Sequence, residues 1–411
     1  MHSERMSSEP GSGDSVSDRY RPFGRRLSVA RLTLTDFRCY EFERLETGPA
    51  PVVLTGSNGA GKTSILEALS MLAPGRGLRR ARLDELPRWR PDGSASSGWA
   101  VAARLSGPND EVDVGTGCEA ASPLAGAPAA RERRQVRIDG RPGKSQAALA
   151  EVLGVAWLTP EMDRLFLDGA ASRRRFLDRL VFGLDPAHAG RVAAYERAMQ
   201  QRSRLLRQGQ ADPVWLSALE DSMATKGVAV AAARRDATAR LTRASARGAG
   251  PFPAATLDSA GHVEDWLDQD PALSVEDKLR AALEASRARD ADTGGAAIGP
   301  HKGDLAVGHA ATGRPAAQCS TGEQKALLVA IVLASARVQS EDRGMTPIVL
   351  LDEVAAHLDA RHRSALFDAV AALDVQAWYA GTDRAVFEPL RGRAQFFAVE
   401  SAAATASPWK G

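Results

Sequence analysis

The sequence predicts an α/β fold: a mixed or parallel sheet, a small antiparallel sheet beside it, and an inserted all-α lobe. Three observations predict it. A glycine-rich loop at 56–63 lies between an apolar strand and a helix, helical signals fill most of 160–294, and the apolar run 346–353 ends in two carboxylates. Because strand signals stand on both sides of the helical stretch, the two outer segments are assigned to one lobe that the helices interrupt.

The glycine-rich loop matches the phosphate-loop pattern G-x-x-x-x-G-K-[ST] at every fixed position, after the strand 51–55 and before the helix 64–72. Glycines let the backbone approach phosphates so that amide groups surround them, and the helix N-terminus adds partial positive charge. Lys62 would reach the β- and γ-phosphates, and the Thr63 hydroxyl would ligate Mg²⁺. The sequence therefore predicts a nucleoside triphosphate site formed by Gly56, Ser57, Asn58, Gly59, Ala60, Gly61, Lys62 and Thr63.

The rest of the first half reads mainly as strands. A β-hairpin is predicted at 27–37 and 42–45, leading toward the phosphate-loop strand. After the first helix, short strand-like runs predict the small antiparallel sheet, and an Ala/Gly/Pro-rich stretch is expected to be a mobile loop. The three runs are 99–105, 111–114 and 134–138, and the loop is 115–130.

Between about 160 and 292 the strand signals vanish and Ala, Arg, Leu and Glu dominate. Asp212 before Pro213 predicts a helix cap followed by a first-turn proline, and 274–277 is close to a capping box. The longest helix fits either a plain bundle or a short antiparallel arm, since its heptads are not sustained enough for a long coiled coil. Helices are predicted at 171–182, 187–207, 213–247 and 274–289.

The second half carries a buried strand, 346–353, that ends in Asp352 and Glu353, with further strands at 375–380 and 395–400. Asp352 would hold Mg²⁺, usually through water, and Glu353 would polarise the attacking water. This division of labour suits phosphoryl transfer, in which positioning and charge stabilisation do most of the work. The alternative interpretation is a strand end with two solvated carboxylates.

The predicted division of the chain follows these changes in composition. Residues 27–159 form the first half of an ATPase lobe, 160–294 the helical lobe, and 295–400 the second half of the ATPase lobe. Residues 1–26 are polar and lack the apolar segment of a signal peptide, and 401–411 are low in complexity. Both terminal segments are expected to be disordered.

Composition limits the classes of function that the chain can serve. With 44% hydrophobic and 25% charged residues it is typical of a soluble globular protein, and the apolar run 326–336 is too short to cross a bilayer. A net charge of +2 and 5% aromatic residues mean that nucleic-acid binding would depend on local basic clusters, not on overall charge or base stacking. The scattered cysteines fit a reducing cytoplasm and give no metal site: Cys39, Cys118 and Cys319.

A possible signature precedes the apolar helix of the second half. Ser320 and Gly322 at a helix N-terminus can contact a phosphate through hydroxyl and amide groups. The order of phosphate loop, helical insertion, S-x-G-x-Q, Asp-Glu pair and L-D resembles the ABC-type ATPase head. In that family the signature serine faces the γ-phosphate of the opposite subunit. The resemblance implies two ATP molecules in a head-to-tail homodimer, with nucleotide contacts also from Gln324 and Asp359.

Further segments narrow the resemblance. L-T-D-F-R-C-Y at 34–40 resembles the opening of the RecF and SMC-like DNA-repair ATPases, and the insertion is far too short for an SMC arm. Three segments look like those of the RecF family: 158–163 with 173–178, G-P-H-K-G-D-L at 299–305, and A-G-T-D at 380–383. The match runs from about residue 27 to 399. Gly303 stands where that family has a carboxylate, no Q-loop glutamine is assigned, and 1–26 and 115–130 have no counterpart.

The family resemblance implies a function. It implies ATP-dependent dimerisation, binding of double-stranded or gapped DNA, slow DNA-stimulated ATP hydrolysis that serves mainly as a switch, and a link to the SOS response. The implied partners are RecR and RecO, and indirectly RecA, in the cytoplasm at the nucleoid, with no membrane. Two alternatives stay open. A transporter ATPase would need a histidine where Thr382 and Asp383 stand, and a monomeric phosphotransferase would bind one nucleotide per chain.

Basic residues of the first half are candidates for DNA binding, because displacing counterions from DNA needs clustered positive charge. One cluster follows the phosphate-loop helix and the other lies near the small sheet. The alternative interpretation is an ordinary solvated basic face, since clustering in sequence does not prove clustering in space. The candidates are Arg76, Arg79, Arg80 and Arg82, then Arg133, Arg134 and Arg137.

Overall fold

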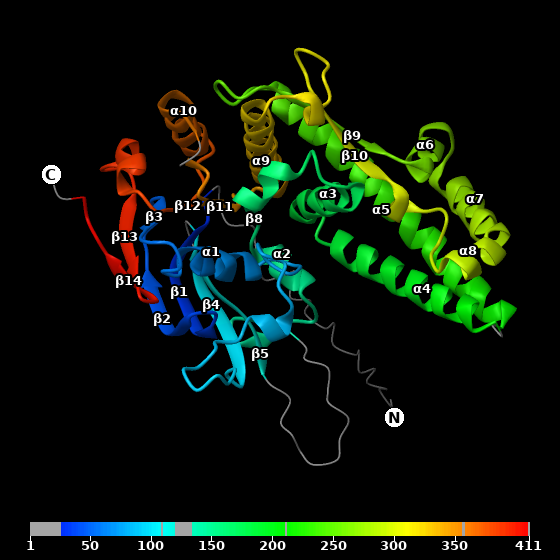
Figure 1. Ribbon diagram of the computed structural model, residues 1–411, viewed down its shortest axis with the longest axis horizontal. Helices are drawn as coiled ribbons and strands as arrows, with labels where there is room; N and C mark the ends of the chain where they lie inside the picture. Colours follow the sequence, from blue (N-terminus) through cyan, green and yellow to red (C-terminus); the bar gives the residue numbers. More distant parts are fainter. Residues whose placement is uncertain (1–25, 108–109, 120–133, 210–211, 356–357, 410–411) are drawn as a thin grey trace, which may run out of the picture.

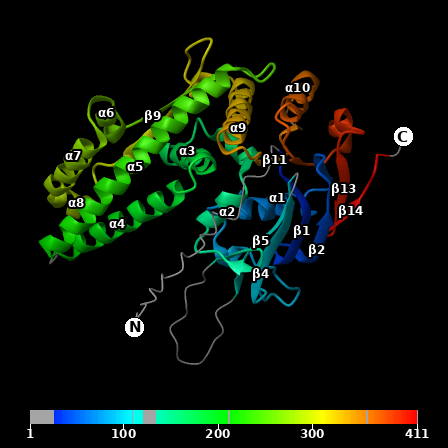
Figure 2. The same ribbon diagram turned by 180° about the vertical axis from the view of Figure 1, so that it is seen from behind.

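The computed structural model describes residues 26–107, 110–119, 134–209, 212–355 and 358–409. Within them, two six-stranded sheets lie on one side of the molecule and a helical lobe extends from the other (Figure 1). The same separation is visible from behind (Figure 2). The predicted disordered segment 1–26 lies almost entirely outside the described residues.

The central sheet has the strand order β14-β13-β3-β12-β11-β8, and all neighbours are parallel except β13 and β14. Its inner strands are apolar and buried, as expected for a parallel sheet covered on both faces. Because parallel strands end at the same edge, the loops that follow β3 and β11 lie near each other. The bounds are β3 Val52–Thr55, β8 Val155–Leu158, β11 Ile348–Asp352, β12 Ala377–Gly381, β13 Gln395–Glu400 and β14 Ala403–Ala406.

The antiparallel sheet has the order β2-β1-β4-β5-β6-β7, and the predicted hairpin is confirmed as part of it. The sheet is larger than predicted because β5 continues to Glu119. Gly115 and Gly117 hide an alternation in which Val114, Thr116 and Cys118 are buried. The loop predicted from 115 is therefore wrong up to 119, and its remainder, 120–130, lies outside the described residues. The bounds are β1 Ser28–Phe37, β2 Tyr40–Glu46, β4 Gly98–Ser106, β5 Glu111–Glu119, β6 Gln135–Ile138 and β7 Arg141–Pro142.

Helices fill the space between and beyond the sheets. Helix α1 packs against strands of both sheets, and α9 packs between the central sheet and α5 of the helical lobe. The Asp212 cap is confirmed, since its side chain accepts from the Val214 amide. The bounds are α1 Lys62–Met71, α2 Ala147–Val152, α3 Ala170–Leu184, α4 His188–Gln208, α5 Pro213–Ala246, α6 His262–Gln269, α7 Ala272–Ala285, α8 Arg287–Thr293, α9 Thr321–Arg343 and α10 Ala360–Ala371.

Two predictions for the helical lobe are wrong. The lobe is not all-α, because β9 Ala255–Ala260 pairs with β10 Asp304–His309, a segment that the predicted division places in the second half of the ATPase lobe. Only alternate residues of β9 are buried, and its polar residues masked the pattern. The helix predicted at 274–289 begins earlier, after Pro271, and breaks at Ser286.

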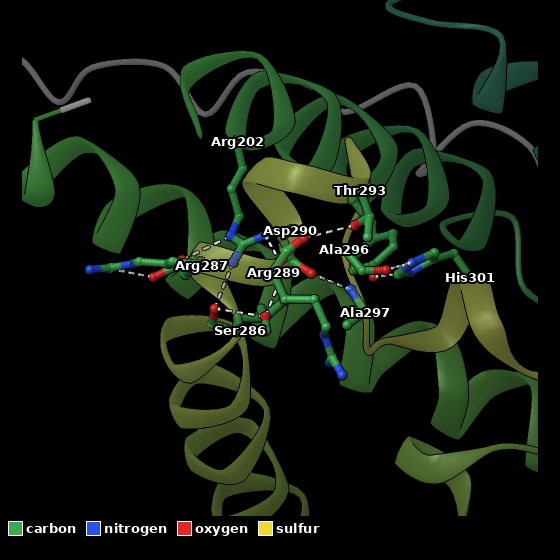
Figure 3. A network of polar contacts seen from close by, with 12 residues as sticks. Arg202, Ser286, Arg287, Arg289, Asp290, Thr293, Ala296, Ala297 and His301 are labelled. Atoms are coloured by element: carbon green, nitrogen blue, oxygen red, sulfur yellow. Dashed lines mark hydrogen bonds and ion pairs between the residues drawn. The ribbon is translucent and has the colours of Figure 1, made fainter. Parts of the chain in front are cut away.

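A buried ion network fixes the far end of the helical lobe (Figure 3). Arg202 of α4 is fully buried and bonds Glu220 of α5 at 2.8 Å and Asp290 of α8 at 2.7 Å. Asp290 also accepts from the Ser286 hydroxyl at 2.6 Å and the Ala297 amide at 2.9 Å. Arg202 therefore belongs to the interior of the lobe and not to a solvated helix face. The Arg202 guanidinium thus joins α4, α5 and α8 through ion pairs whose acidic partners are also buried.

The C-terminal segment is ordered through Trp409, which corrects the expectation of disorder for 401–409; residues 410 and 411 lie outside the described residues. Strand β14 extends the central sheet, and the Arg384 guanidinium lies 4.8 Å from the Trp409 ring. The Ala402 amide donates to the Ala60 carbonyl at 3.2 Å, so this segment touches the phosphate loop. Alanine-rich composition hid a strand that is stabilised by pairing with β13. No helix among the described residues is long and apolar enough to cross a membrane.

Candidate nucleotide-binding site

The phosphate loop connects β3 to α1, as predicted. Two of its glycines occupy backbone conformations that disfavour side chains, with φ of 156° at Gly56 and 116° at Gly61. A Cβ at Gly56 would collide with the Val399 carbonyl oxygen, and one at Gly61 would collide with the Tyr40 hydroxyl. Glycine is therefore required at both positions by packing as well as by conformation.

Lys62 lies inside the loop with only 5% of its surface exposed. Its Nζ donates to the carbonyl oxygens of Gly56 at 2.7 Å and Ser57 at 2.9 Å, and lies 4.0 Å from the Glu353 carboxylate. Burial lowers the pKa of Lys62, and the Glu353 and Asp352 carboxylates oppose that shift. A partly desolvated ammonium held at this position is well placed to donate hydrogen bonds to phosphate oxygens.

The strand end that follows β11 faces the phosphate loop. The Thr63 hydroxyl donates to Asp352 Oδ1 at 3.2 Å, although the two residues are 289 positions apart. Glu353 has a φ of 52°, and its amide donates to the Ala380 carbonyl at 2.9 Å. This left-handed turn is a strained conformation for glutamate and directs its carboxylate toward Lys62 rather than along the strand.

The same oxygens fit a hard divalent cation. Thr63 and Asp352 supply a hydroxyl and a carboxylate, which are the ligand types that Mg²⁺ accepts together with water and phosphate. Burial raises the pKa of Asp352, with the neighbouring Glu353 charge adding to the shift. No cluster of three His, Cys, Asp or Glu side chains suited to a metal occurs in the part of the chain that is described.

These residues surround a cavity of about 460 Å³. Sequence reasoning missed part of its wall: Thr159, Pro160 and Glu161, which follow the parallel strand β8, and Arg79. The position of 159–161 at the carboxyl edge of a parallel strand was the signal that could have found them. The segment leads into the short turn η3 Pro160–Arg164, whose Asp163 bonds Lys325 of α9 at 3.2 Å.

Arg79, one of the predicted DNA-binding arginines, also lines this cavity. Its guanidinium lies 3.7 Å from the carboxylate of Glu67, a fully buried residue of α1. Arg38 holds the same carboxylate through two hydrogen bonds of 2.8 and 2.6 Å. A buried acid on the phosphate-loop helix thus holds two arginines beside the nucleotide cavity.

The signature residues do not reach the cavity of their own chain. Ser320 caps α9 in a capping box with Glu323, and both Ser320 and Gly322 are exposed. Asp359 is likewise exposed and caps α10 by accepting from the His362 amide at 2.8 Å. Gln324 is different: it is buried and donates to the Cys319 carbonyl at 2.9 Å, so its predicted ligand contact is replaced by a supporting role.

The predicted DNA-binding arginines differ in their burial and in their partners. Arg134 is buried, and its guanidinium donates to the carbonyls of Met71, Ala73 and Gly75 after α1, so its assignment to DNA is wrong. Arg133 lies outside the described residues. Five are exposed, and two of these pair with a carboxylate: Arg79 with Glu67 at 3.7 Å and Arg82 with Asp84 at 3.0 Å. The other three are Arg76, Arg80 and Arg137.

Comparison with known proteins decides the family. Residues 28–389 match the family described as the RecF/RecN/SMC N terminal domain. The DNA replication and repair protein RecF of Mesorhizobium japonicum is 48% identical over 374 residues, covering 90% of this chain and 96% of that protein. The RecF of Rhizobium rhizogenes is 46% identical over 384 residues, covering 93% and 99%.

The chain belongs to the RecF family. A solved structure described as the recombination mediator protein RecF-ATPrS in the RecFOR pathway matches with a TM-score of 0.80 at 17% identity, covering 94% of this chain and all of that one. A RecF-ATP structure gives 0.77 with the same coverage. A Pyrococcus furiosus Smc head domain gives only 0.50 at 14% identity. The predicted ABC-type ATPase head and the resemblance to RecF are confirmed.

Proposed function

We propose that this protein is an ATP-gated DNA-binding switch of DNA replication and recombinational repair. The RecF relatives are named for replication and repair, and the RecF structures are described as a recombination mediator in the RecFOR pathway. A nucleotide cavity with phosphate loop and Asp-Glu pair supports the ATP half of the proposal. Family membership supports the finer parts of the proposal: binding of gapped duplex DNA, work with RecR and RecO to load RecA, the SOS link and a place at the cytoplasmic nucleoid.

ATP would bind with its phosphates in the loop. Lys62 would exchange the carbonyls of Gly56 and Ser57 for phosphate oxygens, and Arg79 would add charge from the opposite wall. Mg²⁺, held by Thr63 and Asp352, would neutralise charge on the phosphates. Glu353 would orient a water for attack on the γ-phosphate and take up its proton. Positioning and charge neutralisation are what phosphoryl transfer chiefly requires of a protein.

A second copy of the chain would complete the site. Ser320, Gly322 and Asp359 are exposed helix-cap residues outside the cavity of their own chain. In a head-to-tail homodimer their hydroxyl, amide and carboxylate groups could meet the nucleotide held by the partner. The Lys325–Asp163 ion pair joins the signature helix to the segment that follows 159–161 in the cavity wall. This ion pair supports a physical connection between nucleotide binding and the proposed dimer surface.

One observation carries the proposal: Lys62, Thr63, Asp352 and Glu353 converge on a cavity from which the exposed Ser320 is absent. Sedimentation velocity with and without ATP and a gapped duplex tests it. The Glu353→Gln protein should form a dimer that persists with ATP and DNA, and the Lys62→Ala protein should stay monomeric. Nucleotide binding at one site per chain without any change in sedimentation would instead support a monomeric phosphotransferase.

A further inference from the structure

A second cavity, of about 450 Å³, lies next to the nucleotide cavity. We call it the arginine pocket. Its wall comes from the loop after α1, the segment from β8 through η3, helix α3 and the first turns of α4. Leu78, Thr159 and Glu161 line both cavities. The proposed ATPase mechanism makes no use of this pocket.

Four arginines line the pocket without an ion-pair partner: Arg76, Arg80, Arg175 and Arg179. Arg175 donates to the Ser172 hydroxyl at 2.9 Å, and Arg179 contacts the Met162 sulfur at 3.6 Å. Among the residues that the structure describes, no carboxylate lies within 4.0 Å of these guanidinium groups. Two other arginines of the same lobe, by contrast, hold carboxylates closely: Arg173 with Asp304 at 2.6 Å and Arg234 with Asp178 at 2.8 Å.

Arg179 is the least solvated member of the cluster. Its guanidinium lies 4.6 Å from the Trp157 ring and 5.0 Å from the Phe176 ring. Burial, with a contribution from the Arg80 charge, lowers the pKa of Arg179 to about 9. Trp157 is 94% buried, and its indole N–H has no hydrogen-bond partner in the described structure. Buried polar groups are rarely left unpaired, so the Trp157 N–H favours an acceptor nearby, and the Arg179 charge, which has no ion-pair partner among the described residues, favours an anion.

The acidic residues of the pocket do not neutralise the cluster at contact distance. The Asp178 carboxylate is engaged by Arg234 and His188. Glu161, Asp168 and Glu196 line the pocket but make no ion pair with its arginines. The arginines therefore repel one another: burial, Arg175 and Arg76 lower the pKa of Arg80, and the Glu161 charge opposes that shift only in part. An anion would relieve this repulsion.

We propose that the arginine pocket binds a phosphorylated nucleotide unit. Guanidinium groups match phosphate oxygens in geometry and charge, and the apolar wall offers a surface for a base. A cavity of this volume suits a small ligand and is too narrow for a duplex. The unit could come from a single strand of DNA, which rests on the proposed function, or from a free nucleotide. A ligand bound in the arginine pocket would influence the ATP cavity through the residues that line both: Leu78, Thr159 and Glu161.

The test uses the full chain with Lys62→Ala, which removes phosphate binding in the loop. Fluorescence anisotropy follows a labelled, 5′-phosphorylated tetrathymidylate, and calorimetry follows ADP. Arg80→Gln with Arg175→Gln removes two exposed pocket charges, and Arg204→Gln, an exposed arginine of α4 outside the pocket, is the matched control. Loss of the two charge-assisted contacts should weaken binding about tenfold or more, while the control leaves it unchanged.

The probes separate the sources. If the double substitution weakens binding of the tetranucleotide and the control substitution does not, the ligand is a DNA strand. If the same holds for ADP, the ligand is a free nucleotide. If neither probe binds, if both pocket substitutions leave binding unchanged, or if only a glutamate-rich hexapeptide binds, the proposal is overturned. Duplex binding by the parent chain with ATP is measured separately. ATP-dependent duplex binding without any pocket ligand would overturn this inference and leave the proposed function standing.

Discussion

At the scale of single residues, burial in the nucleotide cavity makes the charged forms of both Lys62 and Asp352 less favourable. Burial lowers the pKa of Lys62 and raises the pKa of Asp352, so each charged form is stabilised mainly by its neighbours. A triphosphate and Mg²⁺ would supply the missing partners. Charge at this site therefore serves ligand binding at the expense of the stability of the empty protein.

The Asp352 carboxylate gives a prediction about pH. Because its pKa is raised in the folded state, its stabilising effect is present below the unfolded pKa and is lost as pH rises through the folded pKa. At pH 7 the nucleotide-free Asp352→Asn protein should therefore melt at a higher temperature than the parent, with the difference shrinking as pH falls through the raised folded pKa and absent below about pH 4. ATP with Mg²⁺ should stabilise the variant less than the parent. A lower melting temperature at pH 7 would contradict this.

Glu353 gives a prediction about turnover. General-base assistance typically contributes 10²–10⁴-fold, so Glu353→Gln should slow ATP hydrolysis by roughly 100-fold or more. ATP affinity should change little, because the contacts of Lys62 and Thr63 remain. Single-turnover hydrolysis and equilibrium binding of ATP measure the two effects separately. Equal losses in both measurements would show that Glu353 serves binding or folding instead.

At the scale of elements, the buried network around Arg202 predicts a large loss of stability. Arg202→Ala would leave Glu220 and Asp290 as buried charges without their partner and should destabilise the protein by about 3–5 kcal/mol. Arg204→Ala, at an exposed position of the same helix, should change stability by about 0.5 kcal/mol or less. Urea unfolding followed by circular dichroism compares the two. Similar midpoints would argue against the network.

Strand β14 predicts an effect of the C-terminal segment on nucleotide binding. Ending the chain after Glu400 removes β14, exposes the edge of β13 and breaks the Ala402–Ala60 hydrogen bond. Weaker ATP binding by several-fold and a greater tendency to aggregate are expected, since an exposed strand edge can pair with other chains. Ending the chain after Trp409 is the control and should preserve both properties. Unchanged ATP affinity in the protein that ends after Glu400 would show that β14 does not support the phosphate loop.

At the scale of the whole molecule, the sequence predicted those parts of the structure whose signal lies within a short segment of the chain. The phosphate loop, the Asp-Glu strand end and the long helices each carry a signal within a few residues. Tertiary partners decided the rest. Arg134 reads as basic surface until the carbonyls after α1 are placed around it, and β14 reads as disordered until β13 lies beside it. Arg79 and 159–161 join the cavity only through the packing of distant segments.

The central claim is that a nucleotide held by Lys62 of one copy is completed by Ser320 of another. Mixing the Lys62→Ala and Ser320→Arg proteins tests it most directly. Each variant alone has no complete site, whereas a mixed dimer joins the intact loop of one chain to the intact signature of the other. With ATP, sedimentation velocity should show dimers in the mixture and only monomers in the separate samples. Monomers in the mixture, or dimers of the Ser320→Arg protein alone, would contradict the claim.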